Sequence, residues 1–371
     1  MSVLMPALNE ERHVADAVRS VLAQRDVDVE VLVVDGRSVD RTRAVLEGLL
    51  ASDSRVRLLD NPSSTIPAGL NVGLSAARGE FVARVDCHAS VSDDYLARAV
   101  AHLRRDDRLA GVGGIRTGVS DNPRGRAVAL ALSSRFGVGN SVNHYGTTYQ
   151  LTDHASFGVY RTAVVRDVGG WDESLPVNED VDFDHRVLAQ SHALGFDPEM
   201  HIRWRVRENP AALLRQYRRY GRGKAAMVRK NGLSAVRLRH LAAPGAVVAT
   251  TGLLALSARY PAALLGLAPY AAGVAIASRT AWVARPPDQE VAAVDVPLAF
   301  VAMHGGWGVG FLEGLLLRKG PALASGSATV LPEPRVGHRS HSGLSRPDAA
   351  GADPRHGENS VREGPSCHVR G

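Results

Sequence analysis

The first hundred residues alternate short apolar runs with helical patterns, and this alternation limits the folds that the chain can adopt. Four runs are short, apolar or β-branched, and closed by polar or turn residues, as strands are: Ser2–Leu8, Glu30–Val34, Val56–Leu59 and Phe81–Val85. Apolar residues recur at helical spacing from Val14 to Leu22, and Ser38 is expected to cap a helix that runs through Leu50. The β-α-β-α-β order predicts an α/β fold with a parallel sheet and right-handed crossovers.

Polar side chains follow the predicted strands at the edge where such sheets bind ligands. They are Asn9, Glu10, Asp35, Asp86 and His88. Acids at the ends of adjacent strands repel one another unless they bind a polar partner, such as a nucleotide or a cation. We expect these residues to converge on one crevice, although Asp86 and His88 taken alone also fit a purely structural strand end.

Two nearly uncharged runs, Leu241–Ala258 and Pro261–Ser278, are each close to the ~17–25 residues that span a bilayer. Only Arg259 and Tyr260 separate them, which predicts a membrane hairpin, with a buried helical pair as the alternative. A third run, Val296–Leu317, contains His304, Glu313 and five glycines. It is compatible with a span, a re-entrant segment or a surface helix. Basic residues flank the hairpin and support a cytoplasmic start and return: Arg237, Arg239, Arg279 and Arg285.

The net charge of +6 is concentrated between Arg203 and Arg239, where 12 lysines or arginines face the single acid Glu208. The position of this block before the apolar runs favours a membrane surface as its partner. It lacks the interleaved aromatic residues of a nucleic-acid stacking platform, so we expect no nucleic-acid partner. From Gly320 onwards, a composition rich in Pro, Gly, Ser, Arg and His predicts a disordered tail.

The two cysteines, Cys87 and Cys367, make a disulfide framework unexpected and fit a reducing compartment. The opening MSVLMPALNEE enters a strand without the charged region and cleavage site of a secretory signal, so we expect the N-terminal half in the cytosol. No GxGxxG follows the first strand, and GRGKAA at Gly221 lacks the pattern of a phosphate loop. These absences disfavour a dinucleotide oxidoreductase and a P-loop enzyme.

Later segments are predicted from composition and spacing. Residues Gly111–Thr152 are rich in Gly, Ser and Asn, and we expect a less regular, substrate-facing region there. Helical patterns cover Glu179–Gln190 and Leu213–Lys230.

Six segments occur in order: PALNEE, VVDGRSVDRT, GLNVGLSAARGEFVARVDCHA, GVYR, GGWDESLPVNEDVDFDHR and QYRRY. Together they resemble family 2 glycosyltransferases, in particular the bacterial branch of succinoglycan-type exopolysaccharide glucosyltransferases. The resemblance covers about residues 1–230 and extends to the apolar C-terminal region. It implies a GT-A fold with a mainly parallel, Rossmann-like sheet, a nucleoside diphosphate sugar donor, a divalent cation and an inverting displacement. The implied organisation is a catalytic domain at 1–232, a membrane region at 233–319 with helices at about 241–258, 261–278 and 296–317, and a tail at 320–371.

In this resemblance Asp86 and His88 occupy the family's DxD position as metal ligands, and Cys87 between them is expected to point into the core. Imidazole suits Mn²⁺ better than the harder Mg²⁺, so Mn²⁺ is favoured and Mg²⁺ stays open. Asp180, in the segment Asn178-Glu179-Asp180, is the implied catalytic base. From its own position it also fits a capping acid at the start of a helix.

Gln216, Arg219 and Tyr220 match the family's QxxRW box with Tyr in place of Trp. Arginine binds diphosphate through paired hydrogen bonds, so the box is implied to bind acceptor and diphosphate together with Glu179 and His154. Many relatives have Asp and Arg where this chain has Gly36 and Leu70, which weakens the case for uridine. The residues implied to hold the donor nucleotide are Pro6, Asn9, Glu10, Asp35, Ser38 and Asp86.

The resemblance implies a membrane-bound enzyme whose catalytic domain is cytoplasmic. We expect it to move a hexose, with glucose as the first choice, from a UDP-sugar to a lipid-linked saccharide in exopolysaccharide or cell-envelope glycan synthesis. Other proteins of polysaccharide assembly are candidate partners. One alternative is a polyprenyl-phosphate sugar synthase. The other, motivated by Gly36 and Leu70, is a non-catalytic nucleotide-binding subunit of a polysaccharide assembly complex.

Overall fold

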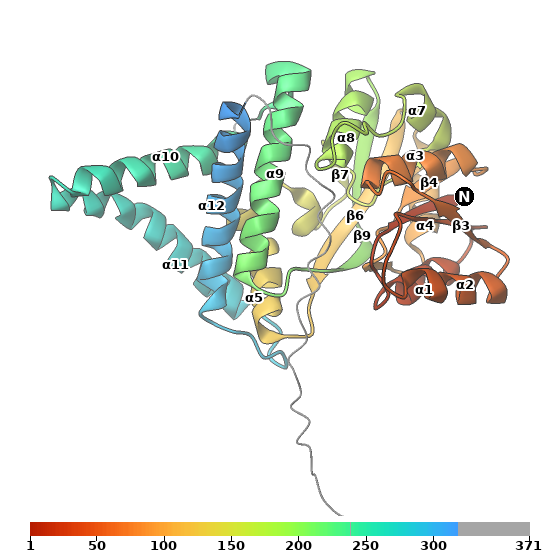
Figure 1. Cartoon of the computed structure of the whole chain (residues 1–371), viewed down its shortest axis with the longest axis horizontal. Helices are drawn as coiled ribbons and strands as arrows, with labels where there is room; N and C mark the ends of the chain where they lie inside the picture. Colours follow the sequence, from red (N-terminus) through yellow and green to blue (C-terminus); the bar gives the residue numbers. More distant parts are fainter. Residues whose placement is uncertain (238, 318–371) are drawn as a thin grey trace, which may run out of the picture. The chain divides into compact units, whose positions relative to one another are not determined.

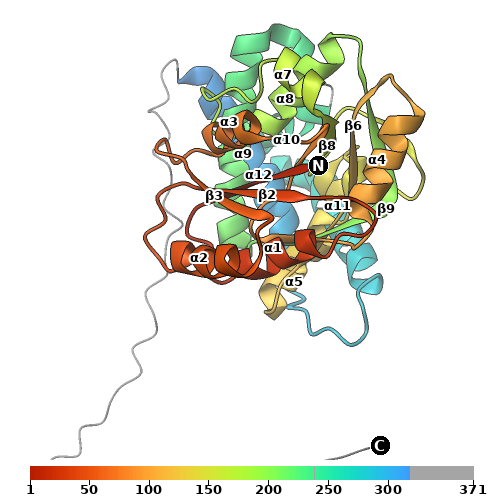
Figure 2. The same ribbon diagram turned by 90° about the vertical axis from the view of Figure 1, so that its right-hand side faces the viewer.

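The computed structural model describes residues 1–237 and 239–317, so the tail predicted at 320–371 lies outside the described residues. A nine-stranded sheet has the order β3-β2-β1-β4-β8-β6-β9-β5, and β7 also pairs with β9 (Figures 1 and 2). The strands are β1 (Ser2–Ala7), β2 (Glu30–Asp35), β3 (Val56–Asp60), β4 (Phe81–Arg84), β5 (Ala89–Val91), β6 (Leu109–Val119), β7 (Gln150–Thr152), β8 (Val159–Arg161) and β9 (Ala193–Arg205).

The first four strands pair in parallel, and each ends within one residue of its predicted end. The predicted β-α-β-α-β unit is therefore confirmed. Beyond β4 the sheet is mixed, because β8 runs antiparallel to both β4 and β6, while β5 runs antiparallel to β9. The parallel half brings the polar residues after β1, β2 and β4 to one edge.

Helices cover the sheet and extend into the C-terminal region (Figure 1). Those of the first 190 residues are α1 (Val14–Leu22), α2 (Thr42–Ser52), α3 (Ile66–Ala76), α4 (Tyr95–Arg105), α5 (Pro123–Leu132), α6 (Arg135–Val138), the 3₁₀ helix η1 (Val142–His144), α7 (Thr162–Asp167) and α8 (Glu179–Ala189). Those that follow are α9 (Pro210–Asn231), the 3₁₀ helices η2 (Gly232–Ala235) and η3 (Pro261–Leu267), α10 (Arg239–Ser257), α11 (Ala268–Val283) and α12 (Asp295–Leu316).

The predicted capping role of Ser38 is wrong, because α2 begins four residues later, at Thr42. The Ser38 hydroxyl instead accepts a hydrogen bond from the backbone N–H of Asn9 at 2.9 Å. The Asp40 carboxylate accepts from the Thr42 N–H at 2.9 Å, at the helix start. Ser38 therefore joins the ends of β1 and β2.

The irregular region predicted at 111–152 is also wrong, since it contains β6, α5, α6, η1 and β7. Its glycines allow close packing rather than loops. A Cβ built on Gly111 would lie 2.2 Å from Tyr160 Cδ1, and one on Gly114 would lie 2.0 Å from the Met200 carbonyl oxygen. Glycine content alone does not distinguish these two uses.

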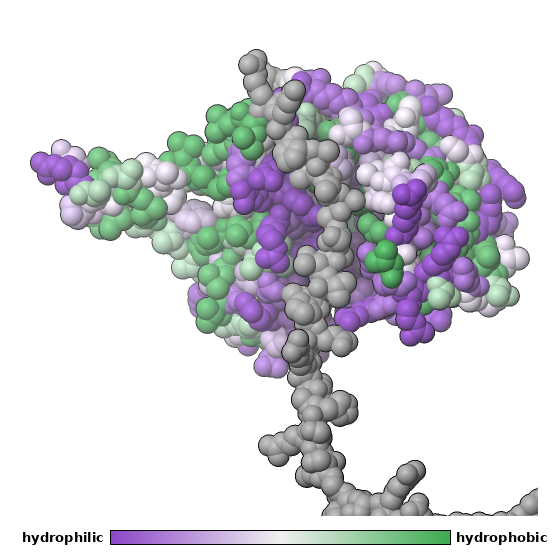
Figure 3. All heavy atoms as spheres, in the orientation of Figure 1, coloured by the Kyte–Doolittle hydropathy of each residue, from purple (hydrophilic) through white to green (hydrophobic). Residues whose placement is uncertain are grey.

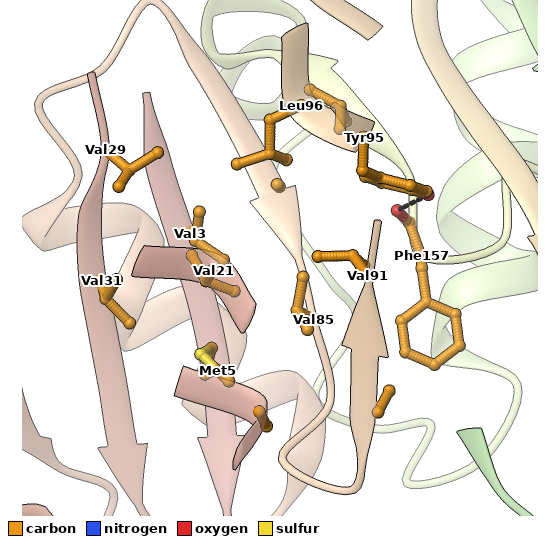
Figure 4. Close-up of a cluster of buried hydrophobic side chains, with 14 of the residues drawn as sticks. Val3, Met5, Val21, Val29, Val31, Val85, Val91, Tyr95, Leu96 and Phe157 are labelled. Atoms are coloured by element: carbon orange, nitrogen blue, oxygen red, sulfur yellow. Dashed lines mark hydrogen bonds between the residues drawn. The ribbon is translucent and has the colours of Figure 1, made fainter. Parts of the chain in front are cut away.

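A large apolar cluster lies between the sheet and helices α1, α2 and α4 (Figure 4). It contains Val3, Met5 and Val85 from the central strands, and the Tyr95 hydroxyl donates to the Phe157 carbonyl at 2.9 Å. Cys87 belongs to this cluster with 1% exposure, as expected from the sequence. Burying its side chain leaves Asp86 and His88 at the sheet edge.

Helix α10 and the η3–α11 segment form the predicted hairpin and project from the rest of the described chain (Figure 1). Arg239–Ser257 and Pro261–Val283 are long and apolar enough to cross a membrane, and their most apolar windows are only 6% and 11% buried. Their surface is mainly hydrophobic (Figure 3). The low burial argues against the buried pair of a soluble protein.

The third apolar run forms α12, which packs along α9. Its glycines recur every fourth residue at the contact: added Cβ atoms on Gly306 and Gly310 would lie 2.6 and 2.0 Å from backbone oxygens of α9. Such small residues let two backbones approach closely. Arg222 adds an ion pair with Glu313 at 2.7 Å. The third apolar run is therefore a helix that packs against the basic helix α9.

We expect Gly310→Ala to destabilise the α9–α12 contact by about 1–3 kcal/mol, since its methyl group would overlap the Arg218 carbonyl. Gly305→Ala is the matched control, because Gly305 lies on the same helix with nothing within 4 Å of the added carbon. The thermal unfolding midpoint of the purified protein in detergent should fall for Gly310→Ala and stay level or rise for Gly305→Ala. Equal midpoints for the two variants would contradict the close contact.

Candidate active site

A cavity of about 850 Å³ lies beyond the end of β4. Strand β4, helix α8 and helix α9 contribute polar residues to its wall, and helices α10 and α12 contribute apolar ones. The predicted site residues that line it are Asp86, His88, His154, Glu179, Asp180, Gln216, Arg219 and Tyr220.

Arg84 fixes two of these carboxylates. Its Nε donates to Asp86 Oδ1 at 2.9 Å, and its Nη1 donates to Glu179 Oε1 at 2.8 Å. Burial raises the pKa of Asp86, but the charges of Arg84 and His88 outweigh it and hold that pKa below its usual value. Burial raises the pKa of Glu179 to about 7 despite the Arg84 contact. Asp86 therefore loses its proton more readily than Glu179.

His88 is oriented by Glu10, whose Oε1 lies 3.1 Å from His88 Nδ1. A carboxylate on one ring nitrogen fixes the tautomer that leaves the other nitrogen free for a metal. Among residues 1–237 and 239–317, no three His, Cys, Asp or Glu side chains gather into a metal site of their own. Asp86 and His88 thus fit a cation that takes its remaining ligands from water and from substrate phosphate oxygens.

Of the residues predicted to hold the nucleotide, Asp86 lines this cavity, whereas the others lie outside it, in β1 or in a hydrogen-bonded turn at the ends of β1 and β2. Asn9 Oδ1 accepts from the Val39 N–H at 2.9 Å, and Asp35 Oδ1 accepts from the Ser38 N–H at 3.3 Å. Pro6 lies in β1, one strand from the site. Glu10 connects the turn to the cavity through His88. The side chain at Leu70 is fully buried in the core, where it serves packing.

Asp180 lies 3.8 Å from His154, measured from Oδ2 to Nε2. The other ring nitrogen of His154 lies 2.7 Å from Asp184 Oδ2, and Asp184 is fully buried. Asp184 also accepts from the Ala155 N–H and the Tyr160 hydroxyl, both at 2.9 Å. His154 therefore stands between two carboxylates on one face of α8.

These contacts shift the pKa values of Asp180 and His154. Burial raises the pKa of Asp180, but the charges of His154 and Arg84 outweigh it and hold that pKa below the usual value. Burial lowers the pKa of His154, while its hydrogen bond to Asp184 and the charge of Asp180 raise it above 6.5 overall. Asp180 is thus an ionised carboxylate, 37% exposed at its side chain, beside a protonatable imidazole.

Helix α9 places the predicted QxxRY residues on the opposite wall. Gln216 is buried, and its Nε2 donates to the Tyr220 hydroxyl at 2.8 Å. The rings of Tyr217 and Tyr220 are 5.6 Å apart, and together they make an aromatic wall beside Arg219. This wall presents a guanidinium and aromatic faces to a ligand in the cavity.

Sequence reasoning missed several cavity residues. Arg84 stands two positions before Asp86, and Asp184 stands four after Asp180, so strand and helix periodicity place each pair on one face. No local sequence pattern marks Arg116 as a residue of the site. Its guanidinium contacts the His144 ring and lies 5.3 Å from the Trp204 ring, and its Nε has no hydrogen-bond partner among the described residues.

Residues 2–168 match the family model described as Glycosyl transferase family 2. A relative over most of the chain is the succinoglycan biosynthesis protein ExoA of Rhizobium meliloti (strain 1021), 29% identical over 332 residues, which are 85% of this chain and 94% of the relative. A second, from Methanococcus voltae, is 23% identical over 62% of this chain and 74% of its own length. It is named dolichyl N-acetyl-alpha-D-glucosaminyl phosphate 3-beta-D-2,3-diacetamido-2,3-dideoxy-beta-D-glucuronosyltransferase.

Among solved structures, the mannosyltransferase PcManGT from Pyrobaculum calidifontis, in complex with GDP-Man and Mn²⁺, has a similar fold. The TM-score is 0.59 at 20% identity, and the match covers 86% of this chain and 87% of that one. The similarity therefore extends beyond residue 168 into the region of α9 to α12.

Proposed function

We propose that this chain, a glycosyltransferase of GT-A fold whose residues 2–168 match the family 2 model, acts on a lipid-linked acceptor. It moves a hexose, with glucose as the first candidate, from a nucleoside diphosphate sugar to a lipid-linked saccharide at the cytoplasmic face of a membrane. The observation that carries this proposal is that one cavity is lined both by Asp86 and Asp180 and by Ala243 and Trp307 of the C-terminal helices.

The names of the relatives support three parts of this proposal: the glycan product, the lipid-linked acceptor and the nucleotide-sugar donor. The Rhizobium protein acts in succinoglycan biosynthesis, and the Methanococcus enzyme is named for a dolichyl phosphate-linked sugar. The Pyrobaculum enzyme binds GDP-Man with Mn²⁺. We accordingly propose a role in exopolysaccharide or cell-envelope glycan synthesis. In the same proposal, residues 1–232 are the catalytic domain and 233–319 are the membrane region.

Asp86 and His88 are the residues proposed to hold the divalent cation, which would neutralise the diphosphate as it leaves. Glu10 keeps the His88 ring in place. Pro6, Asn9, Asp35 and Ser38 are the residues proposed to hold the nucleoside, and uridine is the first base to test.

The chain's own residues perform the displacement. Asp180 accepts the proton of the acceptor hydroxyl, whose oxygen forms a bond to the anomeric carbon as the bond from that carbon to the diphosphate oxygen breaks. The nucleoside diphosphate leaves from the opposite face, so the anomeric configuration inverts. Arg219 binds the diphosphate through charge-assisted hydrogen bonds, and Tyr220 and Glu179 position the acceptor.

The test is a donor screen with the purified full-length protein, Mn²⁺ or Mg²⁺, and a membrane lipid extract, scored by released nucleoside diphosphate. We expect release with one nucleotide sugar and the mass of one added hexose on a lipid-linked saccharide. A product of polyprenyl phosphate carrying a single sugar would instead assign the polyprenyl-phosphate synthase. Failure to transfer from every common nucleotide sugar would reject the proposed function.

Replacing His88 by Asp is expected to shift the metal preference from Mn²⁺ towards Mg²⁺, because an oxygen ligand replaces an imidazole. The measurement is the ratio of initial rates with the two metals at saturating donor. His201→Asp is the matched control, since His201 is exposed on β9 and away from the cavity. An unchanged ratio in His88→Asp would remove His88 from the metal's ligands.

A further inference from the structure

Lys224 is a buried cation inside the cavity that the catalytic steps above do not use. It lies on α9, one turn beyond Tyr220, and is only 4% exposed. Its Nζ contacts Met227 Sδ at 3.4 Å, and no ion pair of Lys224 with an acid occurs in the part of the chain that the structure describes. A thioether is a weak acceptor, so the ammonium group lacks the partner that a buried charge requires.

Two arginines surround the same part of the cavity. Arg237 and Arg239 both contact Asp153, at 3.1 and 2.6 Å. Asp182, the other acid whose charge acts on Lys224, already pairs with Arg186 and Lys230. Burial, followed by the charge of Arg239, lowers the pKa of Lys224 to about 8. The local excess of positive charge is therefore destabilising in the free protein and would be relieved by an anion.

The position of this cluster identifies the source of the anion. Arg239 is the first residue of α10, the first of the two helices long enough to cross a membrane. The cavity wall continues from Lys224 along Ala242, Ala243 and Ala246 of that helix. The charged cluster thus stands where lipid head groups lie when α10 enters a bilayer, with an apolar wall on its membrane side.

We propose that Lys224, with Arg237 and Arg239, binds the phosphate of the lipid carrier, while α10 contacts the first apolar units of its chain. Nothing above assigns this role to Lys224. The inference rests on the proposed function for its choice of a lipid-linked acceptor. Inorganic phosphate has the same charged group as the lipid carrier but no apolar chain. The two ligands are therefore distinguished by whether an apolar chain strengthens binding.

The test measures binding rather than transfer, using the full-length protein in neutral detergent. The probes are farnesyl phosphate, farnesol as its uncharged counterpart, and inorganic phosphate as a head group without a chain. Lys224→Met removes the charge and keeps an unbranched apolar side chain beside Met227. A hydrogen bond to a charged group is worth about 1.5–3 kcal/mol, so we expect roughly 10- to 100-fold weaker binding of farnesyl phosphate.

Four controls make the result specific. Arg215→Met removes a charge from an exposed position on the same helix and should bind farnesyl phosphate as the wild type does. Lys224→Arg keeps the charge and should retain most of the affinity. Nucleoside diphosphate binding with Mn²⁺ should stay within about twofold in Lys224→Met, since the proposed function assigns the donor's phosphates to the cation at Asp86 and His88. The unfolding midpoint of Lys224→Met should not fall, because an unpaired buried charge is lost.

Several outcomes would overturn the proposal: unchanged affinity of Lys224→Met for farnesyl phosphate, an equal loss of nucleoside diphosphate binding, or an equal loss for farnesol. Inorganic phosphate that competes as strongly as farnesyl phosphate would assign a site for free phosphate instead. A protein that binds farnesyl phosphate through Lys224 but transfers no sugar would reject the proposed function and leave this inference standing.

Discussion

Asp180→Asn is expected to reduce the rate of sugar transfer by about 10²- to 10⁴-fold, the range that a positioned general base contributes. Asparagine keeps the shape of the side chain and the hydrogen bond that Oδ1 accepts from the Val181 N–H at 2.8 Å. It cannot take the proton of the acceptor hydroxyl. Because Asp180 is on α8 and the proposed metal ligands follow β4, donor affinity should change little.

The measurement is the initial rate of nucleoside diphosphate release, with binding of the nucleotide followed separately by calorimetry. Asp16→Asn makes the same chemical change on α1, where the Asp16 side chain is 81% exposed, and should leave the rate unchanged. An Asp180→Asn protein that transfers sugar at the wild-type rate would exclude Asp180 as the base. Loss of nucleotide binding would place Asp180 in the donor site instead.

The parallel half of the sheet was predictable because its signals are local. Each strand from β1 to β4 is a short apolar run ended by a polar residue, and parallel pairing then fixes which ends meet. Asp86 and His88 were predicted at this edge for that reason. Helices α8 and α9 were predicted from helical patterns at 179–190 and 213–230.

The contacts that complete the site join residues far apart in sequence, and no local pattern encodes them. Glu10 meets His88 across 78 positions, and Arg84 meets Glu179 across 95. The packing of α12 on α9 likewise depends on a surface that the sequence of either helix alone does not reveal. The errors at Ser38 and at 111–152 have the same origin. Ser38 was assigned to a helix cap and the glycines to irregular structure because those residue types favour such places locally, but tertiary contacts determine their roles in this fold.

His154→Asn is expected to lower kcat by about tenfold and to leave the KM for the donor unchanged, since it disturbs the base and not the nucleotide site. Asparagine places an N–H donor near the position of His154 Nδ1, so the bond to Asp184 at 2.7 Å has a replacement. The imidazole that faces Asp180 at 3.8 Å is lost. We therefore propose His154 as a positioning residue for Asp180.

The pH profile separates this role from a purely structural one. The charge of His154 helps to hold the pKa of Asp180 down, together with Arg84 and Arg116. Asp180 works as a carboxylate, so removing His154 raises its pKa and moves the acid limb of kcat to higher pH. Tyr160→Phe is the matched control, because it deletes a hydrogen bond to Asp184 at 2.9 Å and leaves the imidazole in place. It should lower the unfolding midpoint without moving the acid limb, and a His154→Asn profile that keeps the wild-type limb would limit His154 to a structural role.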